Sequence, residues 1–186
     1  MGPDRALGSA GPAVVLIGTM GAGKSLIGAT LARRWGLEFY DTDDGVSAAA
    51  GMSLPELFEA KGEPYFRQLE RQVVAQALRQ RTGVVALGGG ATTRQATQEA
   101  LALYRSGGGI IIYLDVSLPY AAERVGLGSG RPMIAGDARA RWAELDYARR
   151  PVMQSICTFR ILTDAISAQD AAIEIERRLS LARIPT

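Results

Sequence analysis

The chain has 186 residues and a formal net charge of +2, which suits one domain with its own core and gives no indication of nucleic acid or membrane as a partner. It contains no histidine, and Cys157 is its single cysteine. These counts exclude His-ligated metal sites, Ser-His-Asp triads, Cys-His dyads and an intrachain disulfide, so any proton acceptor must be Asp, Glu, Lys, Tyr or Cys.

The N-terminal lead, residues 1–11, is rich in Gly, Pro and Ala and predicts a disordered tail before a single domain over residues 12–186. The lead lacks the apolar segment of a signal peptide, and no run of 18 apolar residues follows it. Together with the single cysteine, these features lead us to expect a cytoplasmic protein.

Short apolar runs bounded by turn residues predict strands covered on both faces, at residues 13–18, 37–40, 84–87, 109–114 and 159–162. Helical spacing predicts helices at residues 24–35, 63–80, 137–155 and 171–179, with capping boxes at Ser53–Glu56 and Ser167–Asp170. The alternation of strand and helix predicts an α/β domain with a mostly parallel sheet. Between two helical segments, the glycine-rich residues 126–136 indicate a mobile lid, over about residues 124–138.

The first predicted strand leads into GTMGAGKS, residues 18–25, which matches G-x-x-x-x-G-K-S. Its glycines let backbone N–H groups turn toward phosphate oxygens at the start of the next helix. Lys24 would reach the β- and γ-phosphates, and the Ser25 hydroxyl would ligate Mg²⁺. Lys24 is one of two lysines in an arginine-rich chain, which fits a point-charge role.

Three acidic residues, Asp41, Asp43 and Asp44, follow the second predicted strand. Strand carboxyl ends are where open α/β sheets bind ligands, and side chains two apart could face a metal and an acceptor separately. Alone, these residues are more typical of a solvated turn or a helix N-cap. Next to a P-loop they indicate a site.

Two further groups are ambiguous by themselves. Arg67 and Glu70 share one helix face, which is more often a surface ion pair. Gly88-Gly89-Gly90 follows an apolar strand and permits close approach of a ligand, although a tight turn would look the same.

Taken together, the chain resembles the shikimate kinase family over about residues 13–182. The elements that carry the resemblance occur in family order: the P-loop, Asp41-Thr42-Asp43, FRQLE at 66–70, LGGG at 87–90, RPMIAG from Arg131, and Arg149 two residues before Pro151. Each is weak alone, but six in order are specific. The resemblance implies a three-layer α/β/α fold with a five-stranded parallel sheet of P-loop kinase type and a mobile lid.

The resemblance further implies that ATP phosphorylates the 3-hydroxyl of shikimate, with Mg²⁺ as cofactor, giving ADP and shikimate 3-phosphate. Asp43 would bind the acceptor hydroxyls and act as base, and Arg131 would reach the transferring phosphate with the lid. Ser25 and Asp41 would serve Mg²⁺. The implied nucleotide-binding residues are Gly21, Ala22, Gly23, Lys24, Ser25, Leu26, Arg124 and Arg131. The implied substrate-binding residues are Asp43, Arg67, Glu70, Gly88, Gly89, Gly90 and Arg149.

Within these sets, Arg67 and Arg149 would bind the shikimate carboxylate, which suits the fork of the guanidinium, and Arg124 would stack on adenine. We expect a monomer whose partners are shikimate and ATP, without nucleic acid or membrane. The chain departs from the family at Leu26, where Thr or Ser is frequent, at Ala86, where some members have Ser, and over residues 163–170, which lack the arginines and proline common near adenine.

Two alternative functions stay open. A related small-molecule kinase, such as a gluconate kinase, would share the P-loop, although the DTD, FRQLE and glycine elements favour shikimate; competing acceptors in one assay would separate the two. A non-catalytic ligand-sensing domain of shikimate-kinase type would bind ATP without turnover. The presence of both Asp41 and Asp43 argues against that alternative.

Overall fold

The computed structural model describes residues 11–126 and 132–181. The strands are β1 (Val14–Ile17), β2 (Phe39–Asp41), β3 (Val84–Ala86), β4 (Ile111–Asp115) and β5 (Phe159–Leu162). The helices are α1 (Lys24–Trp35), α2 (Thr42–Ala50), α3 (Leu54–Gln80), the 3-10 turn η1 (Ala91–Thr93), α4 (Gln95–Ser106), α5 (Leu118–Arg124), α6 (Pro132–Ile156) and α7 (Ala168–Leu181).

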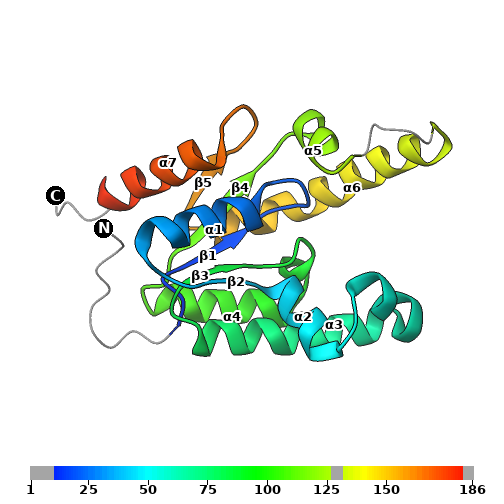
Figure 1. Ribbon diagram of the computed structural model, residues 1–186, viewed down its shortest axis with the longest axis horizontal. Coiled ribbons are helices and arrows are strands. Elements are labelled where there is room, and N and C mark those ends of the chain that lie inside the picture. Colours follow the sequence, from blue (N-terminus) through cyan, green and yellow to red (C-terminus); the bar gives the residue numbers. More distant parts are fainter. Residues whose placement is uncertain (1–10, 127–131, 182–186) are drawn as a thin grey trace.

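The five strands form one parallel sheet in the order β2-β3-β1-β4-β5, with helices on both faces (Figure 1). Alternate residues of β1 serve the two cores: Val14 and Leu16 pack with α1 and α7, whereas Val15 and Ile17 pack with α3, α4 and the end of α6. Burial on both faces is why this strand is apolar throughout. The three-layer α/β/α fold is therefore confirmed.

The predicted helix at 63–80 is the second part of the longer α3, which begins at Leu54. Ser53 caps its start: the Ser53 hydroxyl accepts from the Glu56 N–H, and the Glu56 carboxylate accepts from the Ser53 N–H at 2.8 Å. Gly62, at φ +75°, bends the helix, and Pro64 follows in the first turn after the bend. Helix α2 and the two parts of α3 share a small apolar cluster of Val46, Leu57, Phe66 and Val73, against which Tyr40 of β2 packs.

Two predicted boundaries shift. Gly11, expected in the tail, is buried, and the Pro12 carbonyl accepts a hydrogen bond from Tyr104 Oη at 3.0 Å. Of the expected lid, residues 127–131 lie outside the described residues, and the chain is helical from Pro132 onward. Proline suits the first position of a helix, so α6 begins inside the predicted lid. Across residues 11–126 and 132–181, no helix is both long and apolar enough to cross a membrane.

Candidate active site

The loop between β1 and α1 has the backbone shape that its glycines allow. Gly21 and Gly23 adopt φ +87° and +84°, which glycine reaches without strain. The Lys24 ammonium donates to the Thr19 carbonyl at 3.1 Å, across the loop. Burial lowers the pKa of Lys24, although the carboxylates of Asp43 and Asp41 oppose the shift. The loop thus presents a half-buried ammonium and the start of a helix to one cavity, an arrangement suited to phosphate.

Asp41 links this loop to the end of β2. The Ser25 hydroxyl donates to Asp41 Oδ2 at 2.6 Å, and Asp41 Oδ1 accepts the Asp43 N–H at 3.0 Å as the N-cap of α2. Asp41 therefore caps a helix and also faces the P-loop. Mg²⁺ prefers hard oxygen ligands and usually takes one or two from protein beside substrate phosphates and water. The adjoining Ser25 and Asp41 oxygens fit that donor set.

Asp43 is the second residue of α2, and its carboxylate lies near Lys24 and the glycine triplet. Burial, and next the Asp41 carboxylate, raise the pKa of Asp43 to about 6, although Lys24 opposes the shift. A Cβ atom at Gly88 would overlap Asp43 Oδ1, so this position must be glycine for the carboxylate to lie where it does. The Gly88 N–H donates to Thr42 Oγ1 at 2.8 Å and fixes the triplet against α2. Asp43 is thereby a partly buried carboxylate whose pKa is raised.

The Arg67 side chain is held by two carboxylates of its own helix. Its Nη1 donates to Glu70 Oε2 at 2.9 Å and its Nε donates to Glu63 Oε1 at 3.1 Å. The pair, which alone would be more typical of a surface, is partly buried: Glu70 is 2% exposed and Arg67 is half-buried. A Cβ atom at Gly90 would lie 2.7 Å from Arg67 Nη1, so this glycine leaves the guanidinium its space.

Arg149 reaches the same place from α6. Its Nη1 donates to the Gly89 carbonyl at 3.0 Å. Burial, and next the positive charge of Arg67, lower the pKa of Arg149, although Glu70 opposes the shift. Two guanidinium groups that line one cavity favour an anion between them, and a carboxylate matches their forks.

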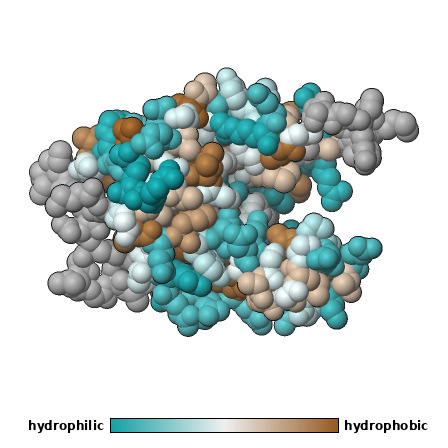
Figure 2. All heavy atoms as spheres, in the orientation of Figure 1, coloured by the Kyte–Doolittle hydropathy of each residue, from teal (hydrophilic) through white to brown (hydrophobic). Residues whose placement is uncertain are grey.

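These groups line one cavity of about 970 Å³. In Figure 2 the surface is hollowed between α3 below and α6 above. The resemblance implies a set of site residues, and all of those that the structure describes, except two, line this cavity. Ala22 is fully buried behind the loop, and Gly88 supports Asp43 from behind. Sequence reasoning missed the apolar wall of Leu54, Phe58 and Phe66, in which the two phenylalanine rings lie 4.4 Å apart.

Comparison with known proteins agrees with this geometry. The family model described as shikimate kinase matches residues 20–180. Shikimate kinases of Salinispora arenicola and Thermobifida fusca are 43% and 42% identical to the chain; the alignments cover 91% and 94% of it and 98% of each relative. The chain belongs to the shikimate kinase family. A solved shikimate kinase from Acinetobacter baumannii in complex with shikimate superposes with a TM-score of 0.85 at 28% identity, over 98% of this chain and all of that one.

Membership of the shikimate kinase family makes the protein an ATP-dependent kinase. The gluconate kinase and ligand-sensing alternatives receive no such support, since the family model and both relatives are shikimate kinases. Arg131 lies outside the described residues, so its predicted approach to the phosphate is untested.

Arg124 sits at the far end of the cavity. It donates to the carbonyls of Gly21, Thr163 and Asp164 and to Thr163 Oγ1. These bonds tie the end of α5 to the P-loop and to the loop after β5. Ile166, Ser167 and Ala168 line the cavity there, so the middle of residues 163–170, a segment that departs from the family pattern, still forms part of its wall.

Proposed function

We propose that the protein transfers the γ-phosphoryl group of ATP to the 3-hydroxyl of shikimate and releases ADP and shikimate 3-phosphate. The presence of Arg67 and Arg149 in one cavity with the P-loop carries the proposal, because two guanidinium groups suit a carboxylate on the acceptor. We also propose that the protein acts as a cytoplasmic monomer on these two small molecules.

In the proposed reaction, Lys24 and the loop amides hold the phosphates while Asp43 accepts the proton of the attacking hydroxyl. The transition state of phosphoryl transfer is loose, so positioning and charge matter more than a strong base. A carboxylate with a pKa of about 6 is ionised at neutral pH and still accepts a proton in the transition state. Arg67 and Arg149 orient the ring by its carboxylate, with Gly89 and Gly90 beside it.

Ser25 and Asp41 would hold Mg²⁺ at the loop. When bound, the ion supplies neutralisation of phosphate charge. Arg131 is proposed on the resemblance alone to approach the transferring group.

The test is ADP release by the purified protein with Mg-ATP and, in turn, shikimate, gluconate or no acceptor. We expect turnover with shikimate well above the other two, and its loss in Asp43→Ala. Preference for gluconate would indicate the related kinase. ATP binding without turnover on any acceptor would indicate the sensing domain.

A further inference from the structure

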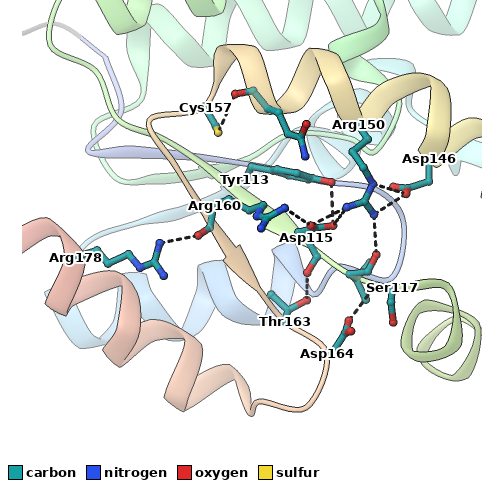
Figure 3. A network of polar contacts seen from close by, with 12 residues as sticks. Tyr113, Asp115, Ser117, Asp146, Arg150, Cys157, Arg160, Thr163, Asp164 and Arg178 are labelled. Carbon is teal, nitrogen blue, oxygen red and sulfur yellow. Dashed lines mark hydrogen bonds and ion pairs between the residues drawn. The ribbon is translucent and has the colours of Figure 1, made fainter.

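Two adjacent arginines of α6, Arg149 and Arg150, bond to different parts of the molecule. Arg149 Nη1 donates to the Gly89 carbonyl at 3.0 Å, at the wall of the large cavity. Arg150 instead reaches the end of β4, where its Nη1 lies 2.7 and 2.8 Å from the two carboxylate oxygens of Asp115 (Figure 3). Successive helix residues point about 100° apart around the axis, so one turn of α6 contacts both the cavity wall and the sheet.

The Asp115 carboxylate is a fixed anchor for Arg150. Asp115 ends β4, which pairs with β1 on one side and β5 on the other, and its side chain is 5% exposed. Tyr113 Oη donates to Asp115 Oδ1 at 3.1 Å, and the Thr163 N–H donates to the Asp115 carbonyl at 2.8 Å. The ion pair with Arg150 therefore ties α6 to an interior strand of the sheet.

Arg150 is also bonded to its own helix. Its Nη2 and Nε donate to Asp146 Oδ2 at 2.7 and 3.1 Å, and the Asp146 side chain is 9% exposed. The planar fork of the guanidinium is thus held between two buried carboxylates, which gives it one orientation. Arg160 lies farther from Asp115, at 3.4 Å, and is more exposed, so Arg150 is the main cation of this cluster.

The residue after Arg150 weakens the backbone of this turn. Pro151 lies inside α6 and has no N–H, so the helical hydrogen bond to the Tyr147 carbonyl is missing. A rotation of about 10° would move a group about 6 Å from the helix axis by about 1 Å. A shift of about 1 Å in a positioning group can lower a rate about 100-fold. A contact outside the helix therefore matters here, and the ion pair of Arg150 with Asp115 provides one.

We propose that Arg150 is a positioning residue for Arg149. The ion pair of Arg150 with Asp115 fixes this turn of α6 from the side of the sheet. It thereby sets the place from which Arg149 reaches the Gly89 carbonyl and the acceptor. The link runs through the backbone of two adjacent residues, so it requires no contact between their side chains. The inference rests on the proposed role of Arg149 in binding the acceptor carboxylate.

The test compares Arg150→Gln with Arg105→Gln in steady-state ADP release with Mg-ATP and shikimate. Arg105 is the matched control, because its Nη1 donates to the carbonyls of Ser155 and Cys157 and so ties down the end of α6 beyond Arg149. We expect Arg150→Gln to raise KM for shikimate about 10-fold, the effect of one charge-assisted hydrogen bond. KM for ATP stays within about 2-fold, and Arg105→Gln matches wild type.

A double-mutant cycle shows whether Arg150 acts through Arg149. In an Arg149→Ala background, we expect Arg150→Gln to change kcat/KM for shikimate by less than about 2-fold, because the group that Arg150 positions is gone. An equal loss in both backgrounds would overturn the inference. A parallel rise in KM for ATP, or a rise of similar size in Arg105→Gln, would overturn it too, because either result would indicate a general defect of α6.

If Arg150→Gln does not fold, Arg150→Lys decides. Lysine keeps a cation between Asp115 and Asp146 but lacks the fork that bonds to both. We expect KM for shikimate to rise at least about 3-fold, with KM for ATP and the circular dichroism spectrum unchanged. An unchanged KM for shikimate would then contradict the inference. Wild-type protein that releases no ADP with shikimate would instead overturn the proposed function, and this inference with it.

Discussion

The proposed nucleotide side of the cavity is built from the backbone of one short run, residues 18–25, whereas the proposed acceptor side is built from side chains of α2, α3 and α6. On the first side, the groups that would hold phosphate are glycine-rich backbone and one half-buried ammonium. On the second, Asp43, Arg67 and Arg149 must meet from distant segments. The contiguous P-loop motif therefore indicates a phosphate site by itself, whereas the acceptor residues indicate a site only when they are considered together.

The two sides also differ in which neighbouring groups a substitution affects. A change in the P-loop affects the loop's own amides, but a change on the acceptor side acts through the neighbours that hold each charged group. The following variants test that difference.

Asp43→Asn should have the largest effect, because it removes the proton acceptor from the acceptor side and leaves the loop intact. We expect kcat to fall about 10²- to 10⁴-fold, the range of general base catalysis, with KM for ATP little changed. The measurement is ADP release with shikimate. Asp44→Asn is the matched control, since Asp44 is exposed on the same helix turn. Equal losses in both variants would assign the effect to α2 rather than to the base.

Gly88→Ala tests whether the backbone of the glycine triplet serves the acceptor side. The new Cβ would overlap the Asp43 carboxylate and displace it. Displacement of a reacting group by about 1 Å can lower kcat about 100-fold. Gly107→Ala is the control, because its Cβ would meet nothing closer than 3.5 Å. Unchanged kcat in Gly88→Ala would show that the placement of Asp43 does not limit the rate.

Arg67→Lys keeps the charge but loses the fork that Glu70 and Glu63 orient. We expect KM for shikimate to rise about 10-fold and KM for ATP to stay the same, as measured by varying each substrate in turn. Arg71→Lys, one turn further along α3 and exposed, provides the control. A rise in KM for ATP of similar size would mean that the two sides are not separate.

The pH profile tests Asp43 without a substitution, and the expected change near pH 6 is about 2-fold. Burial and Asp41 raise the pKa of Asp43 to about 6. The base acts only when ionised, so kcat/KM for shikimate is half its plateau near pH 6 and falls about tenfold per pH unit below that. With no histidine in the chain, an imidazole cannot produce this limb. A limb near pH 4 would mean that Asp43 is not the titrating base, and Asp43→Asn should abolish it.

The parts of the molecule that sequence predicted well are those decided locally. Helix α1 has the predicted bounds, Lys24–Trp35, because a glycine precedes it and Gly36 follows it in the left-handed conformation. The capping box at Ser53 likewise identified a helix start. The bend at Gly62 was not predicted, because a positive φ in one glycine leaves no periodic signal.

Contacts between distant residues could not be predicted in the same way. Asp115 and Arg150 each looked ordinary, one ending an apolar strand and one among many arginines, and only the fold brings them together. Phe58 and Phe66 were missed as cavity lining because aromatic residues at helical spacing are typical of a core. The resemblance supplied the acceptor residues that composition and spacing left ambiguous.

The position of β1 has a kinetic consequence. The P-loop leaves β1 directly, and β1 lies between β3 and β4, with Val14 beside Val84 and Leu16 beside Ile112. Such distant pairs require slow loop closure during folding. The phosphate loop, although contiguous in sequence, therefore gains its shape only when the central sheet has formed. In a refolding experiment, nucleotide binding and acceptor binding should return in the same phase.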